Sequence, residues 1–174
     1  MNYFTPELME RLDSSNPAVA NAADAEWDRR QAEYEGTLQR LEPELPEHVR
    51  AFNDLLLHDA RVFTIARSED RLLLLVLHKT IPPRALIILT YFLAGEPSID
   101  REALPSTERS PVMDYLYNEF DLVRTDDATY YTESILFSNG WEIRLRFHDV
   151  QVTRANPIFA PPGQLPVSIV AQPA

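Results

Sequence analysis

The chain has 174 residues, and 45% of them are hydrophobic, which is enough for one domain with a sizeable core. The formal net charge is −11, from 27 acidic and 16 basic residues, and the sequence contains no cysteine. This charge would repel the phosphate backbone of nucleic acids, and the lack of cysteine excludes disulfides and thiolate metal sites. We therefore expect a single domain (1–174) that has no nucleic-acid partner.

Three helices are predicted in the first third of the chain. Thr5 and Asn16 are each followed by proline, so a side chain that can cap free N–H groups precedes a residue suited to the first helical position. Apolar residues then recur at three- and four-residue spacing, which is typical of helices with one buried face. Pro46 begins the third helix. The expected helices span about 5–13, 17–42 and 46–58, and residues 1–58 form the helical part.

From Ala60 onwards the apolar period changes to two, and β-branched and aromatic residues become frequent, which predicts a sheet. Residues 72–77 are apolar on both faces, so their strand should lie centrally. The inward phase changes near His148, which predicts a β-bulge there. The predicted fold class is α+β, with helices packed on an antiparallel meander (59–156) of five or six strands at about 61–67, 71–79, 85–94, 114–124, 129–138 and 141–153.

The last hairpin supplies the main candidate site. Asn139 and Gly140 lie between two alternating segments and tolerate the positive φ angles of a two-residue type I′ turn. Such a turn would place Glu133 opposite Arg146. It would also gather five ligand-binding candidates on one face of the sheet: Tyr131, Glu133, Arg144, Arg146 and His148.

These five residue types could bind a carboxylate ligand or support acid–base chemistry, since arginine binds oxyanions and histidine titrates near neutral pH. Opposite charges facing each other across strands are also ordinary sheet stabilisers, and this interpretation assigns them no further role. No residue is assigned as catalytic, because no spacing in the sequence matches a catalytic signature.

Other motifs are missing or weak. His58, Asp59 and His78 could meet at one end of the first hairpin, but no compact histidine spacing supports a metal site there. The acidic residues from 114 to 127 lack a calcium-binding loop and are interpreted as a solvated rim. The four glycines form no phosphate-binding or nucleophile-elbow motif. We expect no metal and no cofactor.

The tail, residues 157–174, has no charged side chain and several prolines, which exclude a regular helix. Its apolar residues predict docking on the chain's own sheet or, alternatively, on a second subunit in a homodimer. The first residues lack the basic and apolar regions of a secretory signal, so we expect none, and the apolar runs are far shorter than the roughly 20 residues of a membrane span. We expect a cytoplasmic protein without a membrane partner.

The YFTPEL segment (3–8), the ILFSNGWE segment (135–142) and the FHDV segment (147–150) resemble an uncharacterised bacterial domain family whose members begin with a short helix and close with this sheet. The resemblance implies no activity. Acidity and the lack of catalytic spacing favour a non-enzymatic protein that binds a basic protein partner, as a regulator or an immunity-type inhibitor. The alternative is a small-ligand-binding protein or a hydrolase-type enzyme that uses the Glu133, Arg144, Arg146 and His148 face.

Overall fold

The structure is a computed structural model that describes residues 1–68, 71–79, 84–104 and 110–155. The predicted docking of residues 157–174 and the homodimer alternative lie outside these residues. In the part that is described, no helix is long and apolar enough to cross a membrane. The helical elements are α1 (Pro6–Leu12), α2 (Pro17–Leu41), the 3-10 turn η1 (Glu42–Glu44) and α3 (Glu47–Asn53). The strands are β1 (Ala60–Arg67), β2 (Leu72–Lys79), β3 (Ala85–Leu93), β4 (Ser98–Asp100), β5 (Asp114–Arg124), β6 (Thr129–Phe137) and β7 (Glu142–Ala155).

The helices begin as predicted, and one of them ends earlier. The Thr5 side chain accepts a hydrogen bond from the Leu8 N–H at 3.4 Å, and proline follows the cap. Helix α3 was predicted to reach residue 58 but ends at Asn53. The chain then extends and buries Leu57, and Asp59 adopts a φ of 62°, a conformation that aspartate tolerates better than most residues.

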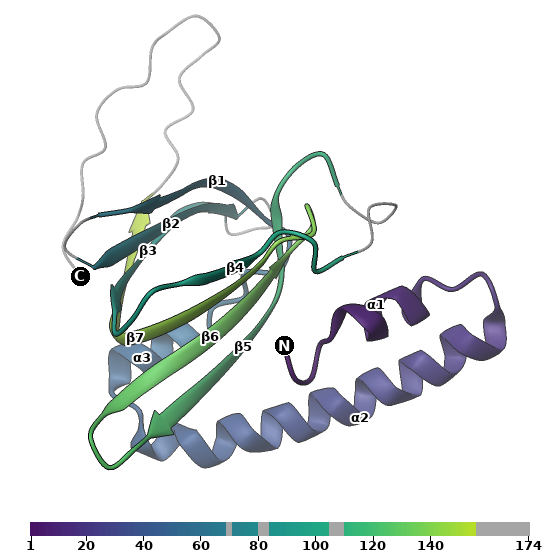
Figure 1. The fold of residues 1–174 in the computed structure, drawn as a ribbon, viewed down its shortest axis with the longest axis horizontal. Helices are drawn as coiled ribbons and strands as arrows, with labels where there is room; N and C mark the ends of the chain where they lie inside the picture. Colours follow the sequence, from purple (N-terminus) through teal and green to yellow (C-terminus); the bar gives the residue numbers. More distant parts are fainter. Residues whose placement is uncertain (69–70, 80–83, 105–109, 156–174) are drawn as a thin grey trace, which may run out of the picture.

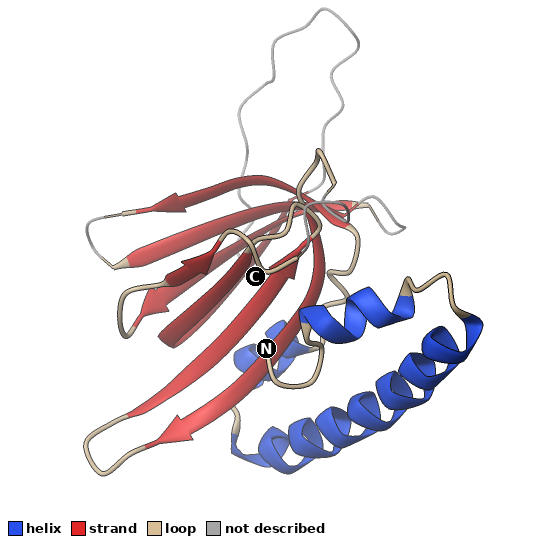
Figure 2. Ribbon diagram, turned by 45° about the vertical axis from the view of Figure 1, so that its right-hand side comes forward, coloured by secondary structure: helices blue, strands red, loops and turns tan. Residues whose placement is uncertain are grey.

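The strands form one antiparallel sheet that closes on itself, with strong curvature (Figure 2). Strand β7 makes the closure, because Phe147 pairs with Tyr131 of β6 on one edge and with Leu93 of β3 on the other. A short pairing of Ala60 in β1 with Tyr115 in β5 completes the ring. The α+β class with an antiparallel sheet is confirmed, but the order is no simple meander, since β3 pairs with β7 and the short β4 is added.

One face of each strand fills the interior of this ring. Helix α3 packs against β7 and covers the interior, where the Phe52 ring lies 6.0 Å from the Tyr91 ring and 6.4 Å from the Phe147 ring. The predicted bulge is confirmed, because Phe92 pairs with Asp149 and Leu93 pairs with Phe147, which leaves His148 as the extra residue.

The β6–β7 loop has three residues rather than the two that were predicted. The Phe137 N–H donates to the Trp141 carbonyl at 2.9 Å, so residues 138–140 form the loop. Gly140 has a φ of 85°, as in a type I turn that ends in a left-handed residue. Glu133 consequently pairs with Leu145, and the predicted register was wrong by one residue. A shift of one residue reverses the face on which a side chain lies.

Helix α2 runs beside the part of β5 that does not pair with β1 (Figure 1). The Phe120 N–H of β5 donates to the Tyr34 hydroxyl at 2.6 Å, and both residues are buried. A backbone donor that would otherwise face the open edge of the strand is satisfied in this way. The helix therefore substitutes for a neighbouring strand at this point.

The N-terminal segment is held against the same strand. Glu119 of β5 is buried, and its carboxylate accepts hydrogen bonds from the backbone N–H groups of Asn2, Tyr3 and Phe4 at 2.6, 2.7 and 2.8 Å. The Phe4 ring then packs on Trp27 of α2 at 4.8 Å. One carboxylate thus fixes the path of the chain into α1.

Replacing Tyr34 with phenylalanine removes only the hydroxyl that accepts from Phe120. The buried N–H then loses its acceptor, so we expect Tyr34→Phe to lower the free energy of unfolding by about 1 to 3 kcal/mol in urea denaturation. Tyr130→Phe is the matched control and should change stability by less than about 0.5 kcal/mol. Equal stability of the two variants would contradict the role given to Tyr34.

Candidate functional site

The structure divides the five residues predicted to share a face. Tyr131 and Glu133 point into the closed interior and are 9% and 1% exposed. Arg144, Arg146 and His148 are exposed on the opposite side of the sheet. The prediction of one common face is therefore wrong, and its physical cause is the extra residue in the β6–β7 loop.

The three exposed residues do not form a site together. Arg144 donates to Glu142 at 2.7 Å. Burial disfavours the ionised form of Glu142, but hydrogen bonds from Arg144 and from the Met1 amino group outweigh burial, so the pKa of Glu142 is lowered. Arg146 lies against Gly95 of the chain that follows β3, and His148 occupies the bulge. Each of these three side chains thus has its own surroundings in the fold, and the three do not converge.

Glu133 lies in a polar cluster inside the sheet. The Tyr115 hydroxyl and the Asn118 amide both donate to its Oε1 atom, at 2.9 and 3.0 Å. Its Oε2 atom and the Tyr91 hydroxyl are buried, and neither has a hydrogen-bond partner among the described residues. Tyr91 lies close enough to affect the pKa of Glu133 without reaching hydrogen-bond geometry.

Burial raises the pKa of Glu133 from 4.5 to about 7, against the opposing effect of the Tyr115 and Asn118 donors and of the nearby Tyr91 hydroxyl. A carboxyl of this kind could exchange a proton near neutral pH. However, it is buried beside an aromatic cluster: Phe120 pairs with Glu133 across β5 and β6, and the Phe120 ring lies 5.5 Å from that of Tyr131 and 6.3 Å from that of Phe52. Neither of the two pockets described below reaches Glu133.

Glu133 makes stability depend on pH. Its pKa is higher in the folded state than in the unfolded state, so the folded state binds more protons between about pH 4.5 and pH 7. The free energy of unfolding should therefore fall as pH rises through this window. We expect Glu133→Gln to be more stable than the parent by about 3 kcal/mol at about pH 8, and this difference to vanish towards about pH 4.5. Urea denaturation of both proteins across this range measures the difference, and a pH-independent difference would contradict the assignment.

The residues weighed as metal ligands do not converge. The His58 ring contacts Asp59 at 3.0 Å and packs beside Tyr117, whereas His78 lies beside the Phe63 ring, 5.5 Å between centroids. Within the described ranges, no group of three histidine, aspartate or glutamate side chains could hold a metal ion. Glu119, which was assigned to a solvated acidic rim, is instead buried.

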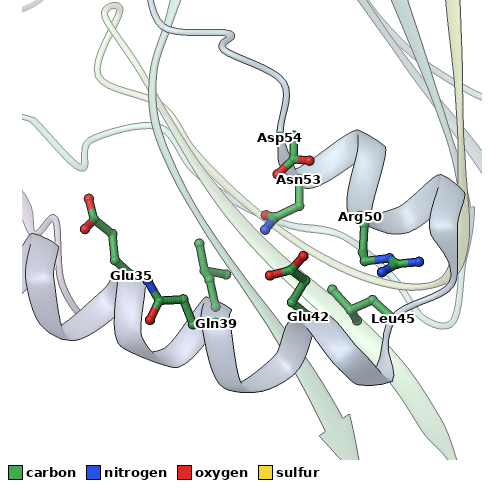
Figure 3. Close-up of a pocket in the computed structure, with 8 residues that line it drawn as sticks. Glu35, Gln39, Glu42, Leu45, Arg50, Asn53 and Asp54 are labelled. Atoms are coloured by element: carbon green, nitrogen blue, oxygen red, sulfur yellow. The ribbon is translucent and has the colours of Figure 1, made fainter.

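A pocket of about 260 Å³, which we call the helix pocket, lies between α2 and α3 (Figure 3). Leu38 and the buried Leu45 provide its apolar part. Its polar lining comes from Glu35, Gln39, Glu42, Arg50, Asn53 and Asp54. Figure 3 shows Glu42 pointing into the space between the two helices, with Asn53 and Asp54 facing it from the end of α3.

The helix pocket is acidic. Three carboxylates line it against one guanidinium, that of Arg50. Among the described residues, none of the carboxylates of Glu35, Glu42 and Asp54 forms an ion pair. This pocket was not predicted, because it depends on how α3 turns back on α2; Pro43 and Pro46 in the connection are the sequence signal of such a turn.

A smaller pocket of about 160 Å³, which we call the end pocket, lies where β2 and β7 end and β3 begins. Three consecutive leucines that follow α3 contribute to it, together with Ala85 and Ile87 of β3. Its charged lining residues are Asp54, Lys79 and Arg154. Asp54 lines both pockets.

No protein family model matches the chain, and no curated protein is similar to it in sequence. By its fold, the chain is an α+β protein with a closed antiparallel sheet. The family resemblance of the YFTPEL and ILFSNGWE segments remains an expectation.

Proposed function

We propose that the protein binds another protein and that the helix pocket accepts a lysine or arginine side chain from a basic segment of that partner. The observation that carries this proposal is the combination of three carboxylates without ion pairs and an apolar floor in one pocket. No catalytic role is assigned to these residues.

The chemistry of the pocket suits a long cationic side chain. Lysine and arginine bury their aliphatic stems on apolar surface while the charged end stays among polar groups. Here the stem would lie on Leu38 and Leu45, and the charged end would approach Glu42 and Asp54. The formal charge of −11 would also attract a basic partner from a distance and raise the rate of association.

The alternative function, a small-ligand-binding protein or hydrolase-type enzyme, depended on Glu133 sharing a face with Arg144, Arg146 and His148. Glu133 lies inside the sheet and the other three lie outside. The alternative therefore lacks a site at which these groups could act on one ligand.

A random peptide library displayed on phage tests the proposal and requires no purified partner. We expect selection on the full chain to enrich peptides in which lysine or arginine is flanked by apolar residues. The selected peptides should lose at least about tenfold in affinity for the Glu42→Lys variant, because a repulsive charge replaces an attractive one. Fluorescence anisotropy with synthetic peptides measures this loss.

Glu10→Lys is the matched control, since Glu10 is exposed on α1, away from the pocket, and the substitution changes the net charge equally. Peptide affinity for this variant should fall by less than about threefold, through long-range electrostatics alone. Selection of acidic peptides, or equal losses for the two variants, would contradict the proposal.

A further inference from the structure

Two cations lie together at the end pocket of this strongly acidic chain. The inward face of β2 carries Leu73, Leu75 and Leu77, and Lys79 is the next residue in this alternation. Strand alternation therefore directs Lys79 towards the interior side, at the last position of the strand. It pairs with Ala85, which lines the same pocket.

Arg154 reaches the same place from β7. It pairs with Ile87 of β3, and directly paired residues of antiparallel strands lie on the same face. Ile87 is buried at 3% exposure, whereas Arg154 is exposed, so the guanidinium lies at the rim of the closed sheet. Two strands that are separated by β3 thus bring one positive charge each to one pocket.

Neither charge is neutralised by an ion pair within the ranges that the structure describes. Below them the lining is apolar and consists of Leu55, Leu57, Ala85 and Ile87. Leu56, which is 79% exposed, adds apolar surface at the same place. A pocket with cations at its rim and hydrocarbon inside matches a ligand that is anionic at one end and apolar at the other.

We propose that the end pocket binds a short alkyl carboxylate, with the carboxylate between Lys79 and Arg154 and the alkyl chain against Leu57 and Ile87. Arginine and lysine both form charge-assisted hydrogen bonds with carboxylates. The volume of about 160 Å³ is close to that of an engineered apolar cavity of about 150 Å³ that holds one benzene molecule, so the alkyl chain has only a few carbons.

Asp54 opposes this binding and provides an internal check. Its carboxylate also lines the end pocket and reduces the net positive charge there from two to one. In the helix pocket the same carboxylate adds to the negative charge. Removal of this one charge should therefore change the affinities of the two pockets in opposite directions.

The probe for the test is pentanoate, titrated into the ¹⁵N-labelled full chain to roughly 50 mM, with pentylammonium as the cation of matched length. We expect saturable shifts for pentanoate at the amides of Leu55–Leu57 and Ala85, and none there for pentylammonium. Lys79→Met and Arg154→Met should each weaken pentanoate by about fivefold, because each removes one half of the cation pair. Acetate, which lacks the alkyl chain, should bind more weakly than pentanoate.

Arg84→Met is the control, because Arg84 immediately precedes β3 and does not line the pocket. It should change pentanoate affinity by less than about twofold. Asp54→Asn should strengthen pentanoate binding and weaken the basic peptides selected for the helix pocket. Absence of saturable shifts, equal shifts with pentylammonium, or full affinity in both Lys79→Met and Arg154→Met would each overturn this inference and leave the protein-binding proposal unaffected.

Discussion

The double pairing of β7 is the constraint on which the rest of the structure depends. This strand is long enough to pair with β6 along its first half and with β3 along its second half, on opposite edges. A sheet that would otherwise be open is closed into a ring, and the inward side chains of its strands acquire a common interior. The His148 bulge lies near the point where the pairing changes from β6 to β3, where extra twist allows one strand to follow two neighbours.

Closure of the sheet also determines where polar groups can act. Inside, Glu133 is buried, so its charge is costly and its pKa is raised to about 7. At the end of the ring, Lys79 and Arg154 occupy the last inward positions of their strands, where charge meets solvent. Outside the sheet, the turn from α2 to α3 forms the acidic helix pocket. The fold thus keeps three charged sites apart: the buried carboxyl of Glu133, the two cations of the end pocket and the carboxylates of the helix pocket.

Much of the fold was predictable from local patterns, and the candidate sites were not. Proline after a capping residue located the starts of α1 and α2, and the alternation of apolar residues located six strands to within two residues. The predicted register of the β6–β7 hairpin was wrong by one residue, because Asn139-Gly140 suits both a two-residue and a three-residue loop. The extra loop residue decides whether Glu133 and Arg146 share a face of the sheet. Pairing of β3 with β7 joins segments far apart in sequence, so no local pattern reveals it. Lys79 and Arg154 do carry a signal, because each continues the inward alternation of its strand by one further step.

The order in which the strands appear along the chain has a consequence for biosynthesis. Strand β3 is complete at Leu93, but the residue that covers its free edge there, Phe147, emerges about fifty residues later. Until then a ribosome-bound chain presents a long, apolar strand with free N–H and C=O groups along one side, which is a template for association with other nascent chains. Truncated products that end before β7 would keep this edge of β3 unpaired.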